Sequence, residues 1–143
     1  MKTIHTLFIE DEKLLRTLFE DAIIGYKDDY AGYEFIPEAV PDLKEAMDYL
    51  NDKPAPDIII LDLRLPSGTM EEYTETPEKE NGFTILKRIK SDDKFKNTPV
   101  IVFTNLSDEE TEKDSLDLKA DAFLIKSKVL PSELLGVIIK LVK

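Results

Sequence analysis

An uninterrupted apolar run, Ile58-Ile59-Ile60-Leu61, constrains the fold of this chain more than any other feature of the sequence. Because the run has no polar residue at alternate positions, it predicts a strand buried on both faces, as in a parallel sheet covered by helices. Asp62 follows directly, at the point where such a strand reaches water. Ligands of open α/β sheets bind beyond the carboxyl ends of the strands, so Asp62 is a candidate site residue by position.

Strand and helix patterns alternate five times along the 143 residues, which predicts one α/β domain over residues 1–143. The alternation favours a doubly wound five-stranded parallel sheet, with right-handed crossovers placing helices on both faces. The second strand is the least apolar and is expected near an edge. No repeat, linker or output domain is visible. The predicted strands are 2–9, 33–40, 58–61, 99–104 and 122–126, and the helices begin near residues 14, 41, 82, 107 and 131.

One segment, residues 67–81, has no apolar period and carries five glutamates against one lysine. It predicts a long acidic surface loop, followed by a helix that begins at Gly82. The spacing of Ser107 and the glutamate three residues later predicts a capping box for the fourth helix. That helix offers little apolar surface beyond Leu116 and Leu118, so we expect it to be loosely held.

Composition excludes several classes of protein. The net charge of −11 opposes binding to nucleic acid or to anionic membranes and favours basic partners or divalent cations. The chain has no cysteine, which excludes disulfides and thiolate metal sites. Its apolar runs are too short for a membrane span or a signal peptide, so a cytoplasmic location is expected.

Polar residues end four of the predicted strands. Glu10 and Asp11 follow the first strand, Asp62 the third, Thr104 the fourth and Lys126 the fifth. Three neighbouring carboxylates need a cation to remain ionised, and all-oxygen ligands suit Mg²⁺. A hydroxyl and an ammonium group suit the oxygens of a phosphoryl group. The pattern predicts that Asp62 is a nucleophile that forms an aspartyl phosphate, with Lys126 countering the charge.

At these positions the chain resembles the response-regulator receiver family, in its CheY-like form of a single receiver domain. The resemblance covers nearly the whole chain and implies a flavodoxin-like strand order of 2-1-3-4-5. No single motif is specific, but together, in order and each at a strand end, the motifs are. They are Phe8-Ile9-Glu10-Asp11-Glu12, Ile60-Leu61-Asp62-Leu63-Arg64-Leu65-Pro66, Asn81-Gly82, Val102-Phe103-Thr104 and Ala120-Asp121-Ala122-Phe123-Leu124-Ile125-Lys126.

The resemblance implies that Asp62 receives phosphate from a histidine kinase or a phosphotransfer protein of a two-component system. Thr104 would then turn its hydroxyl to the phosphate, and Phe123 would act as the switch aromatic. The signal would leave by contact with a downstream protein or by a phosphorelay. The resemblance is also compatible with dimerisation through the fourth helix, the fifth strand or the last helix. The implied ligands of Mg²⁺, or alternatively Mn²⁺, are Glu10, Asp11, Asp62 and the Arg64 backbone carbonyl.

The chain departs from the family pattern at several positions. Ser127 follows Lys126, where the family usually has a proline joined by a cis bond, and Lys128 could assist Lys126. Asn105 stands where a small residue is commoner, and with Arg64 it is expected to flank the phosphate and affect its lifetime. The acidic loop is also longer than the family norm, which suggests a kinase with a basic docking face.

Other classes of protein fit the sequence less well. A haloacid-dehalogenase-like phosphatase would need a second aspartate where Arg64 stands, and a flavin-binding module would need a phosphate loop where the chain is acidic. A degenerate receiver that only binds partners would lack one of the key groups. Asp57 lies at the start of its strand, about 17 Å from the strand's end, so it is rejected as the acceptor. His5 is too far along its strand to act.

Overall fold

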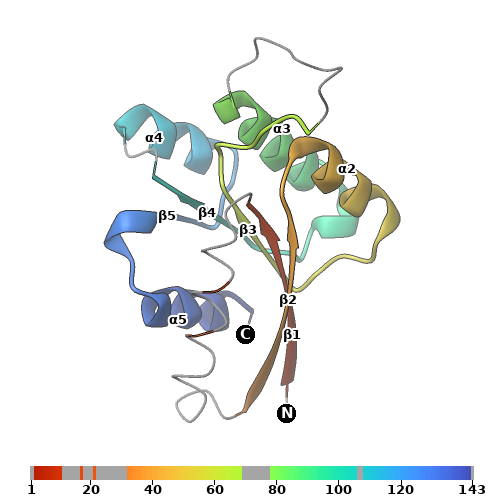
Figure 1. The fold of residues 1–143 in the computed structure, drawn as a ribbon, viewed down its shortest axis with the longest axis vertical. Coiled ribbons are helices and arrows are strands. Elements are labelled where there is room, and N and C mark those ends of the chain that lie inside the picture. Colours follow the sequence, from red (N-terminus) through yellow and green to blue (C-terminus); the bar gives the residue numbers. More distant parts are fainter. Residues whose placement is uncertain are drawn as a thin grey trace.

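The computed structural model describes residues 2–10, 17, 21, 32–68, 78–105 and 108–142. Its five parallel strands form one sheet in the order β2-β1-β3-β4-β5 (Figure 1), which confirms the predicted doubly wound, flavodoxin-like architecture. The less apolar strand β2 lies at an edge, as predicted. The strands are β1 (Lys2–Ile9), β2 (Tyr33–Val40), β3 (Ile58–Leu61), β4 (Val100–Thr104) and β5 (Ala122–Ile125).

Helices cover both faces of the sheet, with α2 and α3 on one side and α5 on the other (Figure 1). The helix expected from residue 14 lies outside the described residues, apart from the helical positions Thr17 and Asp21. Two short 3₁₀ turns, η2 (Asp93–Phe95) and η3 (Lys126–Lys128), complete the described elements. The α-helices are α2 (Leu43–Asp52), α3 (Glu78–Lys90), α4 (Glu109–Asp117) and α5 (Pro131–Val142).

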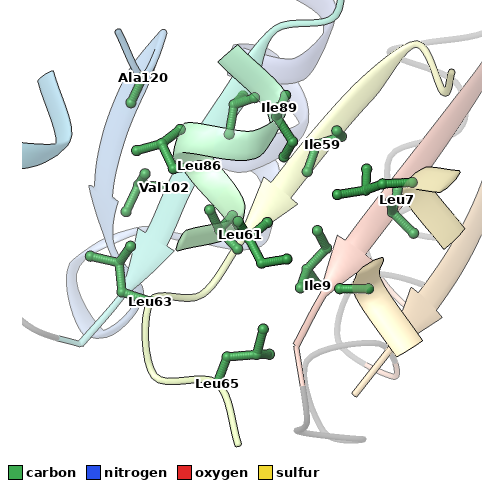
Figure 2. Close-up of a cluster of buried hydrophobic side chains, with 14 of the residues drawn as sticks. Leu7, Ile9, Ile59, Leu61, Leu63, Leu65, Leu86, Ile89, Val102 and Ala120 are labelled. Atoms are coloured by element: carbon green, nitrogen blue, oxygen red, sulfur yellow. The ribbon is translucent and has the colours of Figure 1, made fainter. Parts of the chain in front are cut away.

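Alternate residues of the central strands face opposite sides of the sheet, so the core has two halves. Ile59 of β3 packs with Leu86 and its neighbours beneath α2 and α3 (Figure 2). Ile58 of the same strand packs with Leu135 and the rest of the buried face of α5. All four residues of β3 are buried, as expected of a central parallel strand.

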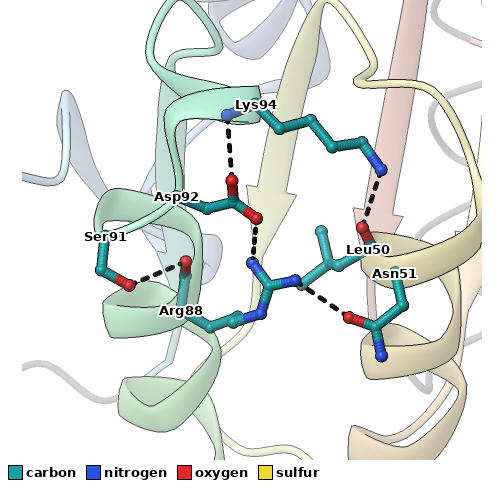
Figure 3. Close-up of polar contacts among 6 residues, drawn as sticks. All are labelled: Leu50, Asn51, Arg88, Ser91, Asp92 and Lys94. Atoms are coloured by element: carbon teal, nitrogen blue, oxygen red, sulfur yellow. Dashed lines mark hydrogen bonds and ion pairs between the residues drawn. The ribbon is translucent and has the colours of Figure 1, made fainter.

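A polar network joins α2 to α3 at the edge of the sheet where β3 begins (Figure 3). The Arg88 guanidinium donates to the Asp92 carboxylate and, at 2.9 Å, to Asn51 Oδ1. Lys94 Nζ donates to the backbone carbonyl of Leu50, near the C-terminal end of α2. These contacts hold α2 and α3 together at the end of the sheet where the strands begin. The predicted site lies at the other end, so the network stabilises the fold and takes no part in the site.

The predicted bounds of two helices were wrong. Helix α3 begins at Glu78, so residues 78–81 belong to the helix and not to the acidic loop. Glutamates favour a helix N-terminus, and Asn81 is buried and hydrogen-bonded there, which fixes this turn. Helix α4 is capped by Asp108, which accepts from the Thr111 N–H at 2.7 Å, whereas Ser107 lies outside the described residues.

The inward face of α4 also differs from the expectation. Leu116 is 46% exposed, and the buried residues of this helix are Thr111 and Ser115. The Ser115 hydroxyl donates to the Thr111 carbonyl at 2.8 Å, within the helix itself. Helix α4 therefore presents hydroxyl groups to the protein interior, where α2, α3 and α5 present aliphatic side chains.

Candidate functional site

The register of β1 and β3 brings two acidic residues together. Ile9 pairs with Leu61, so Glu10 and Asp62 leave neighbouring strands side by side. The Asp62 N–H donates to the Ile9 carbonyl at 3.0 Å, which extends the parallel ladder to the site. Both carboxylates are buried, with Glu10 6% and Asp62 5% exposed. The strand ends thus place two carboxylates in a poorly solvated position.

A residue with a hydroxyl group ends β4, and a residue with an ammonium group follows β5, at the same end of the sheet. Thr104 pairs with Ile125 at the end of the sheet and is fully buried. Lys126 follows Ile125, one residue beyond the strand, and opens the 3₁₀ turn η3. Its Nζ donates to Asp62 Oδ2 at 2.8 Å and forms an ion pair with Glu10 Oε2. The predicted convergence of Glu10, Asp62 and Lys126 is therefore present in the structure.

Burial and charge act together on this cluster. The pKa of Glu10 is raised from 4.5 to about 8, chiefly because the carboxyl group is buried. The Lys126 hydrogen bond opposes this rise, and the charge of Asp62 adds to it. Burial also opposes the charge of Lys126, but its hydrogen bonds to Asp62 and Glu10 outweigh that effect and raise its pKa. When both buried carboxylates are ionised they share one ammonium group, so the cluster then has an excess negative charge.

That excess charge and the all-oxygen donor set fit a divalent cation. Glu10 and Asp62 would supply two of the predicted ligands, with the Arg64 backbone carbonyl as another. Asp11 lies outside the described residues. Within the part of the chain that the structure describes, no group of three or more acidic or histidine side chains could hold a metal ion. The described donors thus form part of the predicted metal site.

The structure also places the other predicted residues. The backbone N–H of Arg64 donates to Asp62 Oδ1 at 3.1 Å, and the Arg64 side chain is exposed. Phe123 of β5 is half-buried against the cluster beneath α2 and α3. Asn105 is exposed and directs its Oδ1 to the Ser127 N–H, at 3.1 Å. The Asn105 contact was not predicted, although the sequence singled out both of its residues.

The segment after Asp62 is anchored from α3. Asn81 Nδ2 donates to the Leu65 carbonyl at 2.7 Å and to Ser67 Oγ at 3.2 Å. A Cβ on Gly82 would lie 2.3 Å from the Leu63 Cα, so only glycine permits this approach of helix and loop. The Asn81-Gly82 pair therefore holds the backbone just beyond the acceptor. The sequence alone did not show which segment this pair contacts.

Helix α2 holds the same segment from the other side. Its first N–H groups, those of Leu43 and Lys44, donate to the carbonyls of Pro66 and Ser67 at 2.8 and 3.2 Å. The N-terminal N–H groups of a helix have no partner within the helix, so the loop supplies acceptors for them. The backbone from Asp62 to Ser67 is thus fixed between two helices.

The two rejected residues lie elsewhere. Asp57 precedes β3 and accepts from the His5 N–H at 2.8 Å, at the opposite end of the strand from Asp62. Asp57 therefore joins β1 to β3.

None of the helices within the described ranges has the length and apolar content needed to cross a membrane.

Comparison with known proteins gives one consistent family. Residues 6–138 match the response regulator receiver domain. The chain is 30% identical over 95 residues to chemotaxis protein CheV2 of Helicobacter pylori, a match that covers 64% of this chain and 26% of that protein. The chain thus spans about a quarter of this relative's length.

Solved structures share the fold. The phosphorylated cyanobacterial phytochrome response regulator RcpA is 27% identical with a TM-score of 0.68, covering 95% of this chain and 89% of that one. The receiver domain of a sensor histidine kinase from Pseudomonas aeruginosa, with a magnesium ion coordinated in its active site cleft, has a TM-score of 0.69 at 18% identity. That match covers 98% of both chains.

Proposed function

Since the chain belongs to the response regulator receiver domain family of two-component signalling, we propose that Asp62 is its phosphoacceptor. The donor is the phosphohistidine of a histidine kinase or a phosphotransfer protein. The observation that carries the proposal is the contact of Lys126 Nζ with Asp62 Oδ2, at 2.8 Å, beside the buried Glu10. The receiver would signal by protein contact or by passing the phosphate onward, in the cytoplasm.

In the proposed reaction an Asp62 carboxylate oxygen attacks phosphorus as the bond from phosphorus to the donor imidazole nitrogen breaks. The donor imidazole carries a proton on its other ring nitrogen, so when it keeps the electron pair of that bond it leaves as neutral histidine, while the aspartyl phosphate forms. Lys126 stays protonated and turns from the carboxylate to the phosphoryl oxygens. The Thr104 hydroxyl donates to another of these oxygens, and Phe123 follows it inward as the switch residue.

Mg²⁺ or Mn²⁺ would be held by Glu10, Asp11, Asp62 and the Arg64 carbonyl. The ion would supply charge neutralisation for the transferred phosphoryl group. The receiver domain with bound magnesium noted above supports this assignment by its shared fold. The Arg64 side chain is exposed two residues after the acceptor, and it is proposed, with Asn105, to limit access of water and so prolong the phosphorylated state. Dephosphorylation by water would regenerate Asp62.

Phosphorylation with a small donor tests the assignment. Incubation with acetyl phosphate and Mg²⁺ should add one labile phosphoryl group by intact mass, and Asp62→Asn should abolish the gain. Asp57→Asn is the matched control, because it removes the same charge from the opposite end of β3, and it should be phosphorylated normally. Steady release of phosphate without a stable adduct would indicate a phosphatase instead. No adduct and no release would indicate a module that only binds partners.

A further inference from the structure

The backbone around Lys126 follows an unusual path for this site. All peptide bonds of the described residues are trans, so the chain turns after β5 without a cis bond. It does so through the 3₁₀ turn η3, which begins at Lys126 itself. Ile125, the residue before the turn, provides no side-chain capping hydrogen bond. Another group must therefore fix the turn that carries the lysine.

Asn105 provides that group. Its Oδ1 accepts from the Ser127 N–H at 3.1 Å, across 22 residues of sequence. The pairing of Thr104 with Ile125 brings the ends of β4 and β5 together, which places Asn105 beside the turn. The contact exists only because residue 127 has an N–H, which a proline would lack. Thus the unusual residues at positions 105 and 127 are partners.

We propose that Asn105 is a positioning residue: its hydrogen bond to the Ser127 N–H fixes η3 and thereby directs Lys126 to Asp62. This inference rests on the proposed function of Asp62 as phosphoacceptor. The Lys126 side chain is 9% exposed and reaches between two carboxylates, so a shift of its backbone changes its distance to both. Phosphoryl transfer depends chiefly on positioning and charge stabilisation, so the effect should appear in the rate of phosphorylation.

Four variants separate this role from a structural one. Asn105→Ala removes the acceptor, whereas Asn105→Asp keeps an oxygen at the same place. Ser127→Ala removes the hydroxyl but keeps the N–H, so it is the matched control. Lys126→Gln removes the group through which Asn105 is proposed to act, and it provides the background in which a further effect of Asn105→Ala should vanish.

The first measurement uses metal-free protein and no phosphodonor. In Asn105→Ala the Ser127 amide should exchange its hydrogen faster, and the Lys126 side-chain NMR signal should move towards those of the exposed lysines. Asn105→Asp and Ser127→Ala should retain the wild-type behaviour of both signals. An unchanged Ser127 exchange rate and Lys126 signal in Asn105→Ala would overturn the proposal, whether or not Asp62 accepts phosphate.

The second measurement is the rate of phosphorylation by acetyl phosphate at saturating Mg²⁺. Asn105→Ala should slow it by up to about a hundredfold, the loss that a displacement of about 1 Å can cause, and Ser127→Ala should leave it unchanged. In the Lys126→Gln background Asn105→Ala should cause no further loss. An equal loss in both backgrounds, or none in the wild-type background, would overturn the proposal. A wild-type protein that takes up no phosphate would instead overturn the proposed function, and the NMR measurement would still decide the role of Asn105.

Discussion

Glu10 and Asp62 compete for one ammonium group, and this competition determines how the site responds to pH. Both carboxylates are buried, and Lys126 contacts both. When all three groups are ionised, one negative charge lacks a partner in a weakly solvated position. A proton on Glu10 relieves the excess in the absence of metal. A divalent cation would relieve it while leaving both carboxylates ionised.

When a chelator keeps divalent cations away, this arrangement predicts an unusual dependence of stability on pH. The pKa of Glu10 is raised from 4.5 to about 8 in the folded protein. The folded state therefore binds the proton more tightly than the unfolded state, and the free energy of unfolding should fall as pH rises between these values. Glu10→Gln should remove this fall, worth on the order of a few kcal/mol. Urea denaturation between pH 5 and pH 8.5 measures it.

The exposed Glu45 of α2 offers a matched control, since Glu45→Gln makes the same chemical change at a position open to solvent. Its pH profile should follow that of the wild type. If, in the presence of a chelator, Glu10→Gln kept the wild-type dependence of unfolding free energy on pH, another group would cause that dependence. The assignment of the raised pKa to Glu10 would then be wrong.

Among the elements, the strands were the most predictable and the segments between them the least. The continuous apolar run of β3 and the acidic residue after it suffice to locate Asp62, because burial on both faces leaves a strong sequence signal. The start of α3 depends on the buried contact of Asn81 with the Leu65 carbonyl, 16 residues away. The Asn105 contact likewise depends on the register of β4 and β5. Neither signal is local in the sequence.

The anchor from α3 predicts a measurable loss of stability. Asn81→Ala should lower the free energy of unfolding by about 1–3 kcal/mol, because it leaves the buried Leu65 carbonyl without its partner. Thr84 is exposed one turn further along, and its hydroxyl donates to the Glu80 carbonyl. Thr84→Ala should therefore change stability by less than about 0.5 kcal/mol. Equal urea midpoints for the two variants would show that the Asn81 contact contributes little.

A substitution in helix α4 should raise the free energy of unfolding, whereas Asn81→Ala should lower it. The Thr111 hydroxyl is buried and finds no hydrogen-bond partner among the described residues. Thr111→Val keeps the shape of the side chain and removes this polar group, so it should stabilise the protein by about 1 kcal/mol. Ser115→Ala, which loses a hydrogen bond to the Thr111 carbonyl, should not stabilise it. A destabilised Thr111→Val in urea denaturation would show that the hydroxyl has a partner after all.

Across the whole molecule, the parallel sheet concentrates negative charge that the chain already carries in excess. The net charge is −11, and the pairing of the strands brings two of its carboxylates to one edge beside Lys126. Any salt should screen the general repulsion between surface charges. Only a divalent cation bound at the site should act through Glu10 and Asp62. Stability in different salts therefore separates the two effects.

Mg²⁺ should raise the thermal unfolding midpoint of the wild type above its value in NaCl of equal ionic strength. A ligand that binds only the folded state at about 100 times its Kd adds about 2.7 kcal/mol. Asp62→Asn removes a proposed ligand and should lose most of the Mg²⁺-specific increase, whereas Asp57→Asn should retain it. Both variants lower the negative charge by the same amount, so screening affects them alike. An equal response of the two to Mg²⁺ would mean that the cation acts on the overall charge and that the cluster at the strand ends does not bind it.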